Sequence, residues 1–362
     1  MENENAPKQN ILSLTFDGLK DFVASQGEPG YRAEQIFPQL HRGIMPSGMT
    51  NVPRRLAQAL EEAFDCRIPG VATKLTSKAD GTVKYLFSLS DGNMIESVVM
   101  KYNHGNTICV STQVGCRMGC AFCASTIGGK VRDLEAGEIL GQIVAAEADS
   151  GERISNVVMM GIGEPLDNFD NVSRFLGIVG DPRGINIGYR HISLSTCGHA
   201  DGIRKLAELR LPITLSISLH AHDDATRSAI MPVNRKWNIS ALMEACRVYR
   251  DATGRRISFE YTLIKGKNCS HGDAAALAGL LNGSLRGKGE KYPVHVNLIP
   301  VNAVAGTGLE PPSREQTEAF RAELEKRGVR ATVRRTLGPD INASCGQLRR
   351  RAASQAIKEG TV

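Results

Sequence analysis

Apolar residues recur at helical spacing in the first part of the chain. Residues Phe16–Ala24, Tyr31–Leu40 and Val52–Phe64 each place apolar side chains three and four positions apart. Pro29 and Gly30 interrupt the pattern between the first two segments, as expected where one helix ends and another begins. The pattern therefore predicts a small N-terminal domain made of helices.

The period changes to that of strands in residues 70–112. The dipeptides Asp80-Gly81 and Asp91-Gly92 are typical of tight hairpin turns, because glycine readily adopts positive φ. The strand-like runs that these turns separate are Val83–Leu89, Met94–Met100 and Thr107–Ser111. This region is predicted to form a β-hairpin extension that leads into the rest of the chain.

Strand-like and helix-like segments alternate beyond residue 112. Such alternation favours a parallel α/β sheet, either open or curled into a barrel, with its ligand site at the carboxyl ends of the strands. The expected strands are Asn156–Met160, His191–Ser195, Ile213–Leu219, Ile257–Leu263 and Val294–Ile299. The expected helices are Ala136–Ala148, Asp201–Leu209, Ile239–Arg250, Asp273–Leu281 and Arg314–Lys326.

The composition is that of an ordinary soluble globular protein, with 41% hydrophobic and 23% charged residues. No apolar run reaches the length of about 18 residues that a membrane span needs, so we expect no membrane partner. Residues 1–10 lack the basic-then-apolar order of a signal peptide, which predicts a cytoplasmic protein. In that compartment the 9 cysteines indicate core, metal-binding or catalytic roles rather than a disulfide framework.

The net charge of +6 is confined to one end of the chain. Residues 1–320 carry equal numbers of basic and acidic side chains, so the whole excess lies in residues 321–362. A local basic end indicates a polyanionic partner. Taken alone, however, such a run is more often the solvated face of a helix.

Three cysteines form the most specific motif in the sequence. Cys116, Cys120 and Cys123 follow the expected strand Thr107–Ser111 with the spacing C-x3-C-x2-C. Structural zinc sites and iron–sulfur clusters usually take four protein ligands, so three thiols on a [4Fe-4S] cluster leave one iron open for a substrate. This spacing is the signature of radical S-adenosylmethionine (SAM) enzymes. The alternative is a zinc site completed elsewhere, for example by His104 or His199.

Polar or glycine residues also lie at the ends of the other expected strands. Gly163 would let a ligand approach the backbone, and Glu164 offers a carboxylate to an amino group. Taken singly, a serine or asparagine at a strand end more often bonds nearby backbone. As a set they fit one cofactor that lies across the sheet. The set comprises Gly163, Glu164, Ser195, Ser218, Leu219, His220 and Asn297.

Two further cysteines are conspicuous. Cys109 lies on the strand that leads to the cysteine motif, and Cys345 lies in a glycine-bounded, polar stretch late in the chain. A lone cysteine is usually a small core residue. The surroundings of Cys345 do not resemble core, so we interpret it as a mobile loop thiol and a candidate nucleophile.

Several motifs, in order and spacing, resemble those of the RlmN/Cfr family of radical SAM RNA adenosine methyltransferases. The resemblance extends from about Leu14 to Arg350, including the segment EPGYRAEQIF, and is greatest to the housekeeping branch of that family. The other motifs that carry it are STQVGCRMGCAFCAST, MGIGEPL, LSTCG, SISLHA and GPDINASCGQL.

The resemblance implies a two-stage mechanism with two SAM molecules per turnover. One SAM methylates Cys345, and a second, on the open iron of a [4Fe-4S] cluster, is split to a 5′-deoxyadenosyl radical. That radical takes a hydrogen from the methyl group on Cys345, and the resulting carbon radical adds to an adenine ring carbon. Glu96 matches the family's proton acceptor, and Cys109 helps to release the product through a transient disulfide with Cys345.

The resemblance also implies the fold and the partners. The fold is α/β, a radical SAM partial (β/α)6 barrel with a helical N-terminal domain and a β-hairpin extension. The expected substrates are 23S rRNA and some tRNAs, and the expected electron donor is flavodoxin-like. The predicted divisions are a helical accessory domain 1–68, a β-hairpin region 69–101, a radical SAM core 102–344 and a basic C-terminal segment 345–362.

The helical domain and the basic C-terminal end are expected to grip RNA phosphates around an unstacked adenine. The flanking arginines that carry this hypothesis are Arg334, Arg335, Arg349, Arg350 and Arg351. Three other readings stay open: the same chemistry at carbon 8 of the adenine, a radical SAM enzyme that acts on a protein or small molecule, and a zinc-binding RNA module without catalysis.

Overall fold

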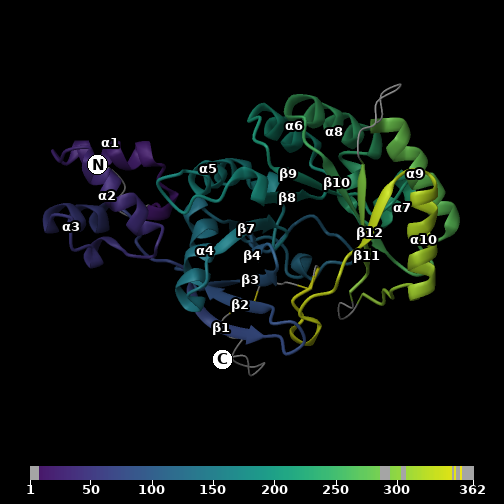
Figure 1. Cartoon of the computed structure of the whole chain (residues 1–362), viewed down its shortest axis with the longest axis horizontal. Helices are drawn as coiled ribbons and strands as arrows, with labels where there is room; N and C mark the ends of the chain where they lie inside the picture. Colours follow the sequence, from purple (N-terminus) through teal and green to yellow (C-terminus); the bar gives the residue numbers. More distant parts are fainter. Residues whose placement is uncertain (1–7, 286–293, 303–306, 345, 348–350, 353–362) are drawn as a thin grey trace.

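The computed structural model describes residues 8–285, 294–302, 307–344, 346–347 and 351–352. In Figure 1 the N-terminal helices lie at one end of the molecule, and the strands form a curved sheet with most of the later helices along its outer side. In the described residues no helix is long and apolar enough to cross a membrane.

The three N-terminal helices occur where their apolar spacing predicted them. They are α1 (Phe16–Ser25), α2 (Tyr31–Leu40) and α3 (Arg54–Ala63). The side chain of Thr15 caps the first helix by accepting a hydrogen bond from the backbone N–H of Gly18. The rings of Phe16 and Phe37 pack edge to face at 5.6 Å and join the first two helices.

The hairpin region is an antiparallel extension of the sheet. Its strands are β1 (Gly70–Thr76), β2 (Val83–Ser88) and β3 (Asn93–Tyr102), and β3 pairs antiparallel with β4 (Gly105–Cys109). Gly81 and Gly92 have φ of 73° and 79°, which confirms both predicted turns. The predicted domain division after residue 101 falls inside β3, and the four divisions stay predictions.

The parallel part of the sheet confirms the α/β prediction. Pairing runs parallel from β4 through β7 (Ile154–Met159), β8 (Ile192–Thr196), β9 (Thr214–Ser218), β10 (Ile257–Leu263), β11 (His295–Pro300) and β12 (Arg330–Val333). The sheet is open, because its order begins at β1 and ends at β12.

Helices connect these strands in the manner of a partial (β/α)6 barrel. Helix α4 follows β4, α5 follows β7, α6 follows β8, α7 and α8 follow β9, α9 follows β10, and α10 follows β11. Their bounds are α4 Ala136–Ser150, α5 Phe169–Val179, α6 Ala200–Glu208, α7 Asp224–Ile230, α8 Ile239–Thr253, α9 His271–Leu285 and α10 Arg314–Lys326.

Three short strands lie outside this main framework. A small separate sheet pairs β5 (Gln113–Val114) with β6 (Arg132–Asp133), which brackets the cysteine motif. Strand β13 (Arg351–Ala352) pairs antiparallel with the start of β3. Residues 351–352 therefore lie beside one of the earliest strands.

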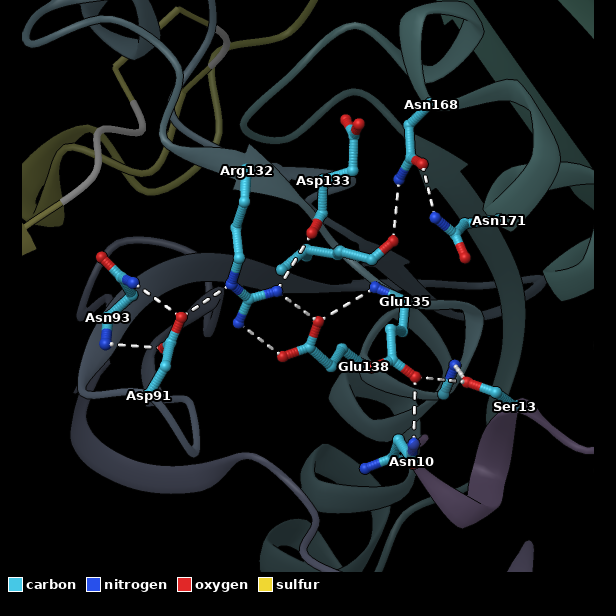
Figure 2. A network of polar contacts seen from close by, with 12 residues as sticks. Asn10, Ser13, Asp91, Asn93, Arg132, Asp133, Glu135, Glu138, Asn168 and Asn171 are labelled. Carbon is cyan, nitrogen blue, oxygen red and sulfur yellow. Dashed lines mark hydrogen bonds and ion pairs between the residues drawn. The ribbon is translucent and has the colours of Figure 1, made fainter. Parts of the chain in front are cut away.

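A polar network joins the segment before α1, the hairpin and α4 (Figure 2). The guanidinium of Arg132 donates to Asp91, in the turn between β2 and β3, at 2.6 Å, and to both oxygens of Glu138 in the first turn of α4. The carboxylate of Glu135 accepts from the backbone N–H of Asn10 at 3.0 Å. These bonds fix the N-terminal segment to the start of α4.

Candidate active site

One cavity at the carboxyl ends of the parallel strands brings most of the predicted residues together. Its walls come from the loops after β4, β7, β8 and β9 and from β10 itself. The predicted residues that line it are Cys116, Cys120, Cys123, Gly163, Glu164, Ser195, Ser218 and His220. Residues predicted separately, on different strands, therefore share one site.

The second half of the cysteine motif is anchored to the barrel by Ala121 and Phe122. The backbone N–H of Ala121 donates to the carbonyl of Ile230, at the end of α7, at 2.9 Å. The ring of Phe122 packs edge-on against the ring of His220 at 4.8 Å. These contacts hold the loop over the cavity with its thiols along one wall.

Burial makes these thiols poor acids unless a cation joins them. Desolvation raises the pKa of Cys116 to about 12 and raises the pKa of Cys120 well above its ordinary value. A metal centre supplies the positive charge that a buried thiolate requires. Three thiols on one wall of a shared cavity, with space beside them for a ligand, fit a [4Fe-4S] cluster with one open iron.

The structure does not support the zinc alternative. His104 stacks on Tyr102 at 5.1 Å, and His199 packs on Trp237 at 4.1 Å while its Nδ1 accepts from the N–H of Gly202. Neither histidine lines the cavity of the three cysteines. Within the described residues, no group of three or more His, Cys, Asp or Glu side chains is arranged to hold a single metal ion.

The loop after β7 needs its glycines because neighbouring chain lies against it. A Cβ at Gly163 would lie 2.7 Å from the Cβ of Gln113, and the φ of Gly163 is 110°. The backbone N–H of Glu164 donates to the Gln113 side chain at 2.9 Å. The cysteine loop and the Gly163-Glu164 loop are thus locked together at close range.

Glu164 is fully buried, and its carboxylate faces two backbone donors. One oxygen accepts from the N–H of Leu166 at 3.1 Å, and the other accepts from the N–H of Cys197 at 2.7 Å. Burial raises the pKa of Glu164, and these bonds oppose the rise. Each carboxylate oxygen can accept a further bond, so a ligand amino group in the cavity remains a compatible partner.

Arg227, which sequence reasoning missed, fastens the ends of β8 and β9. Its buried guanidinium donates to the carbonyls of Cys197 at 2.6 Å, Ser218 at 3.2 Å and Leu219 at 3.0 Å. Its burial is unusual for arginine, and no sequence pattern signals it. Leu219, predicted as a cofactor contact, is fully buried and is absent from the cavity lining.

His220 is a rigid part of the cavity wall. It adopts a left-handed conformation with φ of 58°, and its Nδ1 accepts from the N–H of Thr262 at 2.8 Å. Burial, with Arg227 nearby, lowers the pKa of His220 to about 3. The imidazole is therefore neutral near pH 7 and serves as a hydrogen-bond acceptor in the wall.

Asn297 lies beside the cavity rather than on its lining. Its amide Nδ2 donates to Glu260 at 2.8 Å and to Ser258 at 3.2 Å, and its Oδ1 accepts from Thr332. Its predicted contact with a cofactor stays a prediction. Glu260, which does line the cavity, was missed, although a glutamate within the apolar strand Ile257–Leu263 was a signal that could have found it.

Glu96 forms a buried ion pair outside the cavity lining. Its Oε1 lies 3.2 Å from Nζ of Lys84, and the two side chains are 2% and 6% exposed. The same Lys84 ammonium donates to the backbone carbonyl of Asn342 at 3.0 Å. The predicted proton acceptor is therefore connected to the loop that precedes Cys345.

Cys109 is buried in a small apolar cluster with Ile162 and Ala343, against which Met160 packs. Cys345 itself lies outside the described residues. Of the residues beside it, Gly346 lines the cavity, and its carbonyl accepts from the N–H of Ala124 at 2.7 Å. Residues on both sides of Cys345 in the chain thus contact the surroundings of Cys109 and Cys123.

The fold and the cavity define a radical SAM protein. A model of the Radical SAM superfamily matches residues 110–277. A radical SAM methyltransferase from Sphaerobacter thermophilus has a crystal structure that superposes with a TM-score of 0.87 at 40% identity. The similarity covers 94% of this chain and 99% of that one.

Curated relatives narrow the class further. A probable dual-specificity RNA methyltransferase RlmN from Clostridium acetobutylicum is 50% identical over 94% of this chain and 97% of the relative. A relative with the same description from Clostridium botulinum strain Hall is 49% identical over 96% of this chain and 100% of its own length. The chain belongs to the RlmN family of radical SAM RNA methyltransferases. A [4Fe-4S] cluster and SAM are the cofactors that this membership implies.

Proposed function

We propose that this enzyme transfers a methyl group to carbon 2 of an adenosine in 23S rRNA, and of an adenosine in some tRNAs, by way of a methylated Cys345. The observation that supports this carrier is the 2.7 Å bond from the N–H of Ala124 to the carbonyl of Gly346. It joins the residue after Cys123 to the residue after Cys345. The methyl group proposed on Cys345 would therefore lie near the cluster ligands, where a hydrogen atom can be removed from it.

The chemistry of the adenine favours an indirect route. Carbon 2 is electron-poor, so it is a weak nucleophile and does not attack the methyl group of SAM directly. A carbon radical on a protein-bound methyl group can add to such a carbon. The protein then has to orient the carrier and the base, while the cofactors supply the reactive species.

When bound, the cluster and one SAM supply a 5′-deoxyadenosyl radical, and a second SAM supplies the methyl group. The Cys345 thiolate would take that methyl group with S-adenosylhomocysteine as the leaving group, and the methyl carbon would give a hydrogen atom to the 5′-deoxyadenosyl radical and bond to the adenine. Glu96 would accept the proton that leaves the adenine carbon, and one electron would leave the adduct. Cys109 would attack the sulfur of Cys345 and break its bond to the methylene carbon, which takes up a proton to become the methyl group, while the two cysteines end as a transient disulfide.

The cavity residues divide between two ligands in this proposal. Cys116, Cys120 and Cys123 hold the cluster by their thiolates. The residues proposed to hold SAM are Gly163, Glu164, Ser195, Ser218, Leu219, His220 and Asn297. A flavodoxin-like donor in the cytoplasm supplies the electrons, since each turnover consumes reducing equivalents.

The test is an anaerobic reaction of the cluster-loaded enzyme with SAM, a reductant and unmodified 23S rRNA or tRNA. Nucleoside analysis by mass spectrometry should find 2-methyladenosine, and the Cys345→Ala variant should form none. Formation of 8-methyladenosine would assign the enzyme to the carbon 8 reaction instead. Methylation that survives Cys345→Ala would refute the methyl-carrier mechanism.

A further inference from the structure

Glu260 lines the cavity, and one of its buried carboxylate oxygens has no hydrogen-bond partner among the described residues. The side chain is 3% exposed and lines the cavity from β10. Its Oε1 accepts from Asn297 at 2.8 Å, but its Oε2 has no hydrogen-bond donor. The guanidinium of Arg334 lies 3.7 Å from Oε2, which is an ion-pair distance rather than a hydrogen bond.

An orphaned carboxylate oxygen in such a place requires an explanation. A buried acceptor that has lost water and gained no donor destabilises the fold by about 1–3 kcal/mol, and by more when it is charged. Buried polar groups in proteins are nearly always bonded. An ionised carboxylate can only accept, so the missing partner has to be a donor. Because Glu260 lines the ligand cavity, the ligand is the natural source of that donor.

The position of Glu260 in the sheet indicates which part of a ligand it meets. In the strand register Glu260 is level with Ser218 on β9 and with Asn297 on β11. Glu164 follows β7, which is three strands from β10 in the sheet order. An amino group of SAM held by Glu164 therefore leaves the nucleoside end for Ser218 and Glu260.

We propose that Glu260 accepts hydrogen bonds from the ribose hydroxyls of SAM, and that the bond from Asn297 fixes the orientation of the Glu260 carboxylate. In SAM the ribose hydroxyls lie between the sulfonium and the adenine. Glu260 and Ser218 likewise lie on strands in the middle of the sheet order, between Glu164 after β7 and the edge strand β12. The inference rests on SAM binding, which family membership implies, and does not depend on the carbon 2 product.

The test compares SAM with analogues that lack a ribose hydroxyl. Equilibrium binding to the cluster-loaded enzyme is measured anaerobically by calorimetry, without reductant or RNA. For the unaltered enzyme, removal of the 2′- or 3′-hydroxyl should weaken binding about tenfold to a hundredfold, since a hydrogen bond to a charged group is lost. In Glu260→Ala the affinity for SAM should fall by a similar factor, and the deoxy analogue should bind as well as SAM does.

Two further variants keep the result interpretable. Glu260→Gln preserves the shape of the side chain, so it provides the test if the alanine variant folds poorly. It should lose part of the preference for SAM over the deoxy analogues. Ser258→Ala is the control: Ser258 donates to the other oxygen, Oε1, at 3.4 Å and is bonded by Asn297, but it lies outside the cavity lining. This variant should retain the full preference for SAM over the deoxy analogue.

Three outcomes would overturn the proposal. Unchanged SAM affinity in Glu260→Ala excludes any contact with Glu260. An equal loss for SAM and for both deoxy analogues shows a general effect on the site. If Glu260→Ala binds SAM and an analogue altered at the adenine N6 amino group equally well but still prefers SAM over the deoxy analogues, Glu260 contacts the base rather than the sugar. Because RNA is omitted, failure of the proposed methylation would leave these measurements unaffected.

Discussion

The ammonium of Lys84 lies 3.2 Å from the carboxylate of Glu96, and both side chains are buried. Two charges withdrawn from water in this way are tolerable only together, since either one alone would keep its desolvation cost without its partner. The same ammonium bonds the carbonyl of Asn342, three residues before Cys345. One buried cation thus supports both the proposed proton acceptor and the loop of the proposed methyl carrier.

Replacing Lys84 by methionine should therefore lower the free energy of unfolding by about 3 kcal/mol or more. Lys101→Met is a matched control, because Lys101 and Glu152 form an exposed pair at 2.5 Å whose loss should cost about 1 kcal/mol or less. Urea denaturation measures both. The double variant Lys84→Met, Glu96→Gln should be more stable than the sum of the two single changes predicts, and strict additivity would contradict the coupling.

Gly163→Ala should disrupt the contact between the cysteine loop and the Gly163-Glu164 loop. The new methyl group would meet Gln113 at 2.7 Å, and the φ of 110° is unfavourable for any residue other than glycine. We expect at least about a tenfold loss in SAM affinity together with a lower melting temperature. Gly266→Ala has a positive φ of 72° with nothing within 4 Å, so it isolates the backbone strain. Equal SAM affinities in the two variants would show that the close contact is unimportant.

Arg227→Met should destabilise the cavity more than an ordinary surface change. The carbonyls of Cys197 and Leu219 would lose their donor in a buried region, which should cost about 3 kcal/mol or more. Arg204→Met is the control, since Arg204 makes only an exposed pair with Asp201 at 3.4 Å. Denaturant unfolding and the iron content per chain are the measurements. Similar stability of the two variants would contradict a structural role for the buried guanidinium.

Stability should fall on mild acidification because two histidines are buried as neutral rings. Burial lowers the pKa of His220 to about 3 and that of His41 to about 4 from 6.5. Between the folded and unfolded pKa values, protons bind the unfolded chain preferentially. The stability that the two neutral rings contribute is therefore complete above pH 6.5 and is lost as the pH falls toward the folded pKa values. Each should add up to about 1.4 kcal/mol per pH unit to the slope below pH 6.

Urea unfolding between about pH 4.5 and 6.5 measures this slope above the range in which most carboxylates titrate. His220→Gln keeps an oxygen acceptor for the N–H of Thr262 and should remove one share of the slope. His41→Gln should remove the other, since it keeps an acceptor for Ile185. A slope that is the same in all three proteins would rule out these rings as its source.

Charge reversal of Arg349, Arg350 and Arg351 should weaken RNA binding. If these side chains contact phosphates, the logarithm of the affinity should depend on the logarithm of salt concentration with a slope smaller by about 2. Lys326→Glu is the control, because Lys326 lies at the carboxyl end of α10, at the opposite end of the barrel from the cavity. Filter binding across a salt series would detect the difference, and an unchanged slope would contradict the phosphate contacts.

The elements that sequence periodicity predicted are those that bury one regular face. Helices α1 to α3 and the central strands have such faces, and their predicted bounds agree with the structure to within a few residues. The elements that were missed include β1 and β12, edge strands that are largely exposed, and α7, which is short. Helix α5 was also missed although its apolar spacing is regular, so it was accessible to the same reasoning.

The site was predictable where a motif marks it and obscure where burial creates it. The cysteine spacing and Gly163-Glu164 are visible in the sequence, and the structure gathers them in one cavity. Arg227 is a charged residue in a buried position, and sequence alone does not reveal that the fold withdraws it from water. Glu260 is also buried, and its place within an apolar strand was the signal that was overlooked. Asn297 was expected to meet a ligand because of its place in a strand, and this stays a prediction; the sequence did not reveal that the cross-strand register also brings its amide to Glu260.

The bond between Ala124 and Gly346 also bears on how the enzyme is made. The ribosome synthesises the cysteine loop well before the segment that contains Gly346, and β3 long before its partner β13. A nascent chain that is still attached to the ribosome can thus fold most of its barrel while the site lacks its final wall. Under the proposed mechanism, a chain that stops before Cys345 should form its barrel but fail to transfer a methyl group.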